Sequence, residues 1–170
     1  MKLAIMQPYF FPYPGYFDLI RQIDRWIVFD TAQYIRHGWV NRNRILHPES
    51  GWQYVIVPLK KHQRDTAIEQ IEISTGEDWK GKILRQLEHY RKKAPHYPET
   101  VSLVESALNS TEQRLSRLNA LVLQAICQVL GINFQYDFFS EMSVEAGPIE
   151  GPGDWALQIA AGVQATEYIN

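Results

Sequence analysis

The sequence contains one cysteine, so a disulfide within the chain and a metal site made of cysteines are both excluded. Cys127 lies in the apolar run ALVLQAICQVLG, where a buried thiol is more common than a nucleophile. HExxH, CxxC, paired acidic and GxSxG motifs are also missing. We therefore expect neither a structural metal nor a serine-hydrolase triad.

Long hydrophobic runs are missing as well, and the N-terminus lacks the basic and then apolar layout of a signal peptide. Charge of one sign is not in excess, because the formal net charge at pH 7 is -2. Without a basic field, a nucleic acid is not an expected partner. These absences predict a cytoplasmic protein without a membrane span.

What is present indicates one globular domain. The 170 residues suffice for a hydrophobic core, 45% of them are hydrophobic, and no repeat or linker divides the chain. We therefore expect residues 1–170 to form a single domain.

Apolar strand-like runs alternate with segments of helical spacing. Strands are predicted for KLAIMQ, RWIVFD, WQYVIVPLK, IEQIEIS and INFQYDFFS. Helices are predicted from Tyr16 to Ile23, from Trp79 to Tyr90, from Val101 to Leu108, from Leu115 to Val129 and over DWALQIAAG. The alternation predicts an α/β, Rossmann-like layered fold with a mostly parallel sheet, in which residues 3–7, 26–30 and 53–59 are neighbouring strands.

A rigid aromatic loop, PYFFPYPGYF, joins the first predicted strand to the first helix. Ligands of parallel α/β sheets bind beyond the carboxyl ends of the strands, where this loop lies. Tyr9 and Tyr16 could wall a pocket, Gln7 precedes the loop, and Gly15 would let a ligand approach the backbone. The N–H groups of the following helix suit a phosphate. The alternative is a loop that serves packing alone.

Polar side chains gather after the second predicted strand, which ends at Asp30. Within FDTAQYIRHGWVNRNRI they are Gln33, Tyr34, Arg36, His37, Trp39, Asn41, Arg42, Asn43 and Arg44. Asn offers a donor and an acceptor, and Arg offers a planar fork for phosphate or carboxylate. The alternative is an exposed polar loop whose arginine stems cover the core. A third polar block, Lys60, Lys61 and His62, follows the WQYVIVPLK strand and is either a phosphate site or a solvated turn.

These blocks resemble the WbqC-like family of bacterial proteins. The similarity is carried by MQPYFFPYPGYFDLI, VFDTAQYIRHGWVNRNRI, IVPLKKH with IEQIEI, and YRKKAPHYPE, and continues more weakly to ATEYIN. Members occur among genes for surface polysaccharides such as O-antigen and for modified sugars. Some have been proposed to transfer glycine or another amino acid to an amino sugar. Family chains usually continue beyond the ATEYIN block. We therefore expect either that a last segment has been lost or that this is a shortened member whose site is completed otherwise, for example by a second subunit of a homo-oligomer.

The start of the chain also resembles, more distantly, the HxGH nucleotidyltransferases, which implies a nucleotidyltransferase-like N-terminal half. Gly15-Tyr16 stands where those enzymes have Gly-His, and Tyr13 stands where they have the first His. Both histidines stabilise charge on phosphates, so their absence argues against nucleotidyl transfer at this loop.

The resemblance implies a transferase that moves an acyl or aminoacyl group to a nucleotide-linked amino sugar. Asp30 or His37 would be the base. The substrate-binding candidates are Gln7, Tyr9, Gly15, Tyr16, Gln33, Tyr34, Trp39, Asn41, Arg42, Asn43, Lys60, Lys61 and His62. ATP or an activated acyl donor is the expected co-substrate. Two alternatives stay open: an ATP-dependent adenylate-forming ligase or nucleotidyltransferase relative, and a non-catalytic sugar-nucleotide-binding or scaffold subunit.

Overall fold

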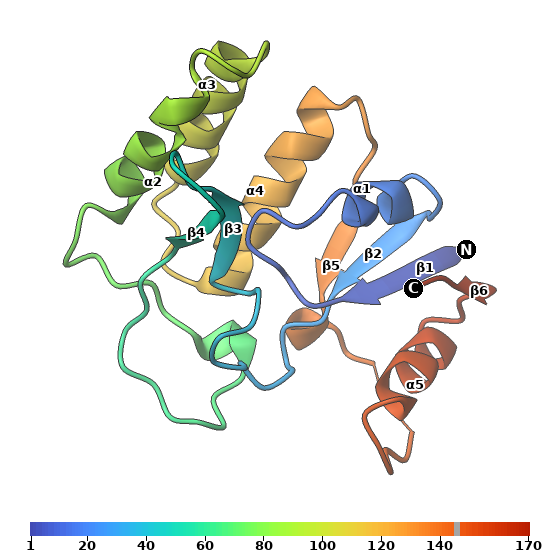
Figure 1. Ribbon diagram of the computed structural model, residues 1–170. Coiled ribbons are helices and arrows are strands. Elements are labelled where there is room, and N and C mark those ends of the chain that lie inside the picture. The colour runs from blue at the N-terminus through green and yellow to red at the C-terminus, as the bar shows by residue number, and fades with distance from the viewer. Residues whose placement is uncertain (145–146) are drawn as a thin grey trace.

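A parallel sheet joins the two ends of the chain (Figure 1). The computed structural model describes residues 1–144 and 147–170. The sheet has four strands in the order β5-β2-β1-β6, and each neighbouring pair is parallel. Its strands are β5 (Tyr136–Phe138), β2 (Arg25–Val28), β1 (Lys2–Met6) and β6 (Glu167–Tyr168). The prediction of a Rossmann-like α/β fold with a mostly parallel sheet is confirmed.

Helices cover both faces of this sheet, as buried parallel sheets require. Because successive side chains of a strand point to opposite faces, Ala4 packs in one core cluster and Leu3 and Ile5 in another. The first cluster lies beneath α1 and α4, and the second lies beneath α5. The helices are α1 (Gly15–Ile20), α4 (Leu115–Val129) and α5 (Asp154–Gly162).

A second part of the molecule consists of a hairpin and two helices that pack on α4 (Figure 1). The hairpin pairs β3 (Arg42–Leu46) with β4 (Trp52–Ile56), and the helices are α2 (Trp79–Leu87) and α3 (Tyr97–Leu108). Single 3₁₀ turns complete the chain: η1 (Ile68–Gln70), η2 (Glu88–Tyr90) and η3 (Phe139–Glu141). The helix α4 therefore contributes to two cores, one under the sheet and one under the hairpin.

The prediction that residues 53–59 form a third strand of the parallel sheet is wrong. β4 pairs antiparallel with β3 in a separate two-stranded sheet, and β5 takes the place beside β2. The burial of β4 explains the difference, because Val55 is buried whereas Trp52 and Ile56 are exposed. One buried face is typical of an antiparallel hairpin and not of a central parallel strand.

The predicted strand IEQIEIS is also wrong. Residues 68–70 form the turn η1, and the rest of the segment makes only isolated bridges, such as Leu59 to Ile73. Ile68, Ile71 and Ile73 are nevertheless buried, so the apolar pattern correctly indicated burial but not a ladder.

Helix boundaries follow the local signals closely. α2 begins after Asp78, whose side chain accepts a hydrogen bond from the Gly81 N–H at 3.0 Å. α4 ends before Gly131, whose φ of +64° is the left-handed conformation that favours glycine. α3 begins four residues earlier than predicted, at Tyr97, because Pro98 fits in a first helical turn. Within the described residues, none of the helices has the length and apolar character needed to cross a bilayer.

The Cys127 thiol is predicted to be unreactive in the folded protein. Its side chain is 1% exposed in the core beneath α1 and α4, and this burial raises the pKa of the thiol to about 11. A thiol-specific reagent at pH 8 should therefore modify native protein at least about tenfold more slowly than urea-unfolded protein. Because the folded pKa lies above the unfolded value, the stability contributed by the neutral thiol should be lost as the pH rises above about 8.5. Equal modification rates in the two states would contradict the burial of Cys127.

Candidate functional site

Two loops meet at the carboxyl ends of the central strands. The loop of residues 7–14 follows β1, and the segment of residues 29–41 follows β2, so parallel pairing brings them together. The buried Asn119 of α4 joins them, because its Nδ2 donates to the carbonyl oxygens of Pro8 and Val40, both at 2.7 Å. The Phe10 N–H also donates to the Trp39 carbonyl at 3.0 Å.

The two loops enclose a cavity of about 480 Å³, which we call the aromatic cavity. It is lined by Met6, Tyr9, Pro12, Tyr13, Tyr16, Trp39 and Asn43. Its position, at the end of β1, is that of ligand sites in parallel α/β sheets. Aromatic walls of this kind stack on planar bases or on the apolar faces of sugars. The structure thus brings four expected binding residues together: Tyr9, Tyr16, Trp39 and Asn43.

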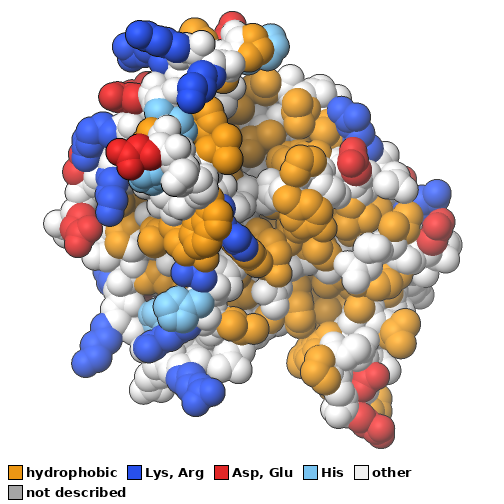
Figure 2. Space-filling model, viewed as in Figure 1, with side chains coloured by type: hydrophobic (Ala, Val, Ile, Leu, Met, Phe, Trp, Pro, Cys, Tyr) orange, Lys and Arg blue, Asp and Glu red, His pale blue; other side chains and the backbone are white. Residues whose placement is uncertain are grey.

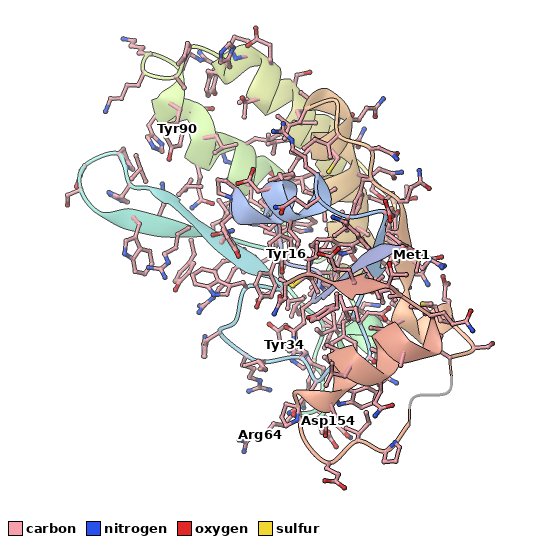
Figure 3. The ribbon with its side chains drawn as sticks, turned by 90° about the vertical axis from the view of Figure 1, so that its right-hand side faces the viewer. Met1, Tyr16, Tyr34, Arg64, Tyr90 and Asp154 are labelled. Atoms are coloured by element: carbon pink, nitrogen blue, oxygen red, sulfur yellow. The ribbon has the colours of Figure 1, made fainter. Side chains whose placement is uncertain are left out.

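Tyr16 forms the floor of this cavity and belongs to the core (Figure 3). Its side chain is 1% exposed, and its hydroxyl donates to the Gln7 carbonyl at 3.0 Å. Burial raises the pKa of Tyr16 well above its ordinary value, so the phenol stays neutral. Its ring packs against Tyr9 at 5.5 Å between centroids. Tyr16 therefore has no exposed polar group to offer a phosphate.

Gly15 makes room for a side chain of the same loop. A Cβ at this position would lie 2.3 Å from Cε2 of Tyr13. Glycine is therefore needed at position 15 because of the Tyr13 ring, and not because of the expected approach of a ligand to the backbone. The expected phosphate site at the start of α1 is also occupied, since the N–H groups of Tyr16, Phe17 and Asp18 donate to carbonyls of Tyr13 and Pro14.

Arg44 lies beside the aromatic cavity in a clamp of two indole rings. Its guanidinium carbon is 4.9 Å from the ring centroid of Trp39 and 4.7 Å from that of Trp52. The side chain is exposed, and no carboxylate of the described residues lies within ion-pair distance of it. Both indole rings lie within cation–π distance of the guanidinium, whose N–H groups have no ion-pair partner among the described residues and stay available to an anion. In the sequence Arg44 belongs to the polar cluster but is not an expected binding residue, because only the pairing of β3 with β4 brings Trp52 next to it.

The other polar side chains of NRNR bind the protein's own backbone. The Asn41 side chain donates to the Val57 carbonyl at 3.0 Å and accepts from the Tyr34 hydroxyl at 2.8 Å. Asn43 Nδ2 donates to the carbonyls of Phe10 and Phe11, where Phe11 has a φ of +45°. Arg42 donates to the carbonyls of His37 and Gly38 and lies over Tyr54. Replacing these asparagines should therefore lower stability, and their role toward a substrate stays a prediction.

The two candidate bases differ in access. The Asp30 carboxylate is 0% exposed, and its two oxygens accept hydrogen bonds from the N–H and hydroxyl of Ser140 at 3.0 and 2.7 Å. His37 is exposed in a left-handed conformation, with φ of +67°, and its Nδ1 lies 3.5 Å from Arg42. Only His37 can therefore meet a solvent-borne substrate without rearrangement.

The aromatic cavity is not lined by Lys60, Lys61 or His62. Of the three segments expected to bind a ligand, only the aromatic loop and the polar cluster after β2 therefore meet in one pocket. Lys60 pairs with Glu72 at 2.6 Å, Lys61 is exposed, and His62 packs edge-to-face against Tyr34. Gln33 and Tyr34 line a different cavity of about 600 Å³ together with Ile35, Arg36 and Arg64. In Figure 3 this second cavity's labelled residues, Tyr34 and Arg64, lie below Tyr16.

A cavity larger than the aromatic cavity lies elsewhere and holds none of the predicted residues. It measures about 670 Å³, lies between α3 and α4, and is lined by uncharged side chains such as Asn109, Gln124 and Gln128. Distance from the carboxyl ends of the strands makes it a weaker candidate than the aromatic cavity. Among residues 1–144 and 147–170, no three His, Cys, Asp or Glu side chains are grouped to hold a metal ion.

Comparison with known proteins identifies related sequences. The model of the WbqC-like protein family matches residues 7–170. A relative named "Uncharacterized protein Rv1507c", from Mycobacterium tuberculosis (strain ATCC 25618 / H37Rv), is 34% identical over 170 residues, which cover 99% of this chain and 71% of the relative. No solved structure matches the chain significantly.

Replacing Asn119 should destabilise the two loops and lower the free energy of unfolding of the protein. Asn119→Ala leaves the carbonyls of Pro8 and Val40 buried without a donor, and each such group costs about 1–3 kcal/mol. We expect the free energy of unfolding, measured in urea, to fall by at least about 2 kcal/mol. Asn133→Ala, an exposed position after the same helix, is the control and should change it by less than about 0.5 kcal/mol. If the two variants are equally stable, the loops are held in place by other contacts.

Proposed function

The chain belongs to the WbqC-like protein family, and from this membership and the aromatic cavity we propose that it transfers an acyl or aminoacyl group to the amine of a nucleotide-linked amino sugar. The family name connects the chain with surface polysaccharides and modified sugars. The observation that carries the proposal is the pairing of an aromatic cavity with a clamped arginine at the carboxyl ends of β1 and β2.

The aromatic cavity receives a flat ring of the substrate in this proposal. Tyr9 and Trp39 come from different loops, and their rings are partly exposed toward the cavity. A base or the apolar face of a sugar gains most from such walls, because stacking on an aromatic ring is worth about 1–3 kcal/mol per base. Few polar atoms line the cavity, so it favours rings over free phosphate.

Arg44 takes the diphosphate. A guanidinium held between two indoles loses little freedom when it binds, and its N–H edge matches two phosphate oxygens. This assignment replaces Arg42, Lys60 and Lys61, which the sequence favoured, because the structure uses Arg42 and Lys60 in contacts of its own.

The reaction joins the sugar amine to the carbonyl carbon of an external activated acyl donor. The amine nitrogen attacks that carbon, His37 takes the proton that the amine loses, and the tetrahedral oxyanion collapses with departure of the donor's leaving group. The thiol of Cys127 is buried and does not line the cavity, so it does not carry the acyl group. Tyr13 is exposed and lines the cavity, and in this proposal its hydroxyl donates to the oxyanion.

Calorimetric titration with UDP- and dTDP-linked amino sugars tests the binding site. Trp39→Ala and Arg44→Gln should each weaken binding about 10- to 100-fold, since each removes about 1.5–3 kcal/mol of stacking or charge-assisted hydrogen bonding. Arg44→Lys should weaken it too, because an ammonium cannot reproduce the planar fork. Arg21→Gln, at an exposed position directly after α1, removes the same charge away from the cavity and should bind normally.

Turnover assays separate the three candidate functions. Mass spectrometry of an acylated amino sugar, formed with the native protein and diminished in His37→Gln, would support the transferase. Release of AMP or diphosphate from ATP would support the ligase instead. Tight binding without any product would assign a binding subunit. If no nucleotide-linked sugar binds, or if Arg44→Gln and Trp39→Ala bind as the native chain does, the proposed site is wrong.

A further inference from the structure

A second cleft lies on the other side of the loop that walls the aromatic cavity. It measures about 420 Å³ and shares Pro12, Tyr13 and Asn43 with the aromatic cavity. Its remaining walls come from β3, β4, α2 and α3, and its apolar lining includes Phe11, Ile45, Val55, Ile83, Leu87 and Val104. Figure 2 shows hydrophobic side chains gathered over the middle of this face of the molecule, between the hairpin and α1.

Among the described residues that line this cleft, Arg44 alone is charged, and a guanidinium repels an ammonium group. Asn43 uses its Nδ2 on the carbonyls of Phe10 and Phe11, and its Oδ1 accepts the N–H of Arg44 at 2.7 Å. The hydroxyls of Tyr13 and Thr100 belong to exposed residues at its rim. Among the described residues that line either cavity, none is Asp or Glu. An ammonium group, such as a glycyl group carries, would lose its hydration here without gaining a carboxylate.

We propose that this cleft receives the hydrocarbon chain of an acyl group, so that the group transferred at the adjacent aromatic cavity is a fatty acyl group and not an aminoacyl group. That the bound chain belongs to a transferred group rests on the proposed function. That the ligand is a hydrocarbon chain rests on the cleft alone. The shared loop of Pro12 and Tyr13 places the carbonyl end of such a chain beside the aromatic cavity. A volume of about 420 Å³ lies within the range of small-molecule sites.

The dependence of affinity on chain length distinguishes binding by apolar burial from binding by polar groups. Each methylene buried from water strengthens binding about fourfold, which corresponds to about 0.8 kcal/mol. Hexanoate, octanoate and decanoate, each titrated calorimetrically below its micellar concentration, should therefore bind with affinities that rise up to about 15-fold per two methylenes. Glycine and glycine methyl ester should not bind at the same concentrations. Equal affinity along the series, or stronger binding of glycine methyl ester than of decanoate, would overturn the proposal.

Thr100 offers a way to fill the cleft without altering the core. It is exposed on α3 and lines the cleft, so Thr100→Trp should obstruct the chain, whereas Thr100→Ser should leave the space open. We expect Thr100→Trp to weaken decanoate binding at least about tenfold and Thr100→Ser to leave it within about twofold. Decanoate affinity unchanged in Thr100→Trp would place the chain elsewhere and refute the assignment.

Methyl spectra locate the chain independently of any variant. In the native protein with labelled isoleucine and valine methyls, decanoate should shift the signals of Ile83 and Val104 at the cleft. Ile159, which lies in the core beneath α5 on the opposite side of the sheet, is the internal control and should not move. Shifts at Ile159 without shifts at Ile83 and Val104 would contradict the proposal.

Failure of this inference is distinguishable from failure of the proposed function. Thr100 does not line the aromatic cavity, so Thr100→Trp should bind the nucleotide-linked sugar normally. Sugar binding that survives without decanoate binding overturns the acyl cleft alone. Decanoate binding without sugar binding leaves the cleft in place and overturns the sugar site.

Discussion

The side-chain amide of Asn119 is the contact on which the candidate site depends. From the buried face of α4 it donates to a carbonyl in each of the two loops that follow β1 and β2. Separating the loops would leave these two carbonyls without their donor, and a buried carbonyl that loses its hydrogen bond costs free energy. The folded arrangement of the two loops is therefore strongly favoured. Together with the hydrogen bond from the Phe10 N–H to the Trp39 carbonyl, this amide sets the distance between the Tyr9 and Trp39 walls of the aromatic cavity. The helix that supports the parallel sheet thereby also shapes the site.

Rigidity of the site comes from the protein's own polar groups. Asn43 holds the left-handed turn at Phe11, and Asn41 joins Tyr34 to Val57, the residue after β4. Such internal bonds leave these amides little capacity for a ligand but fix the loops in advance of binding. A preformed cavity loses less conformational freedom when a ligand enters. The arginine that stays available, Arg44, is held by stacking and not by a carboxylate, which preserves its charge for an anion.

The loop of residues 7–14 separates two spaces of different chemistry. On one side aromatic rings suit a planar molecule, and on the other side mostly aliphatic walls suit a hydrocarbon. Arg44 lines the aliphatic cleft and stacks on Trp39 of the aromatic cavity, so it lies between the two. Its prolines restrict the backbone, and Tyr13, at 61% exposure, stands between the two spaces. A transferase needs two substrates to meet at one point, and a thin rigid partition with an open edge meets that requirement.

The sequence by itself determined the layered α/β class, the parallel pairing that follows a strand–helix–strand pattern, and most helix boundaries, because these depend on local periodicity and on caps such as Asp78. It also indicated that the loops after β1 and β2 would meet. Tertiary structure alone decided the place of WQYVIVPLK, since an apolar run suits a hairpin and a central strand equally well until its partner is known. It likewise decided which polar residues are free: Asp30 is committed to Ser140 and Lys60 to Glu72, at separations of 110 and 12 residues along the chain. Hydrogen-bonding capacity is a local property, but its occupation depends on distant partners that folding brings together.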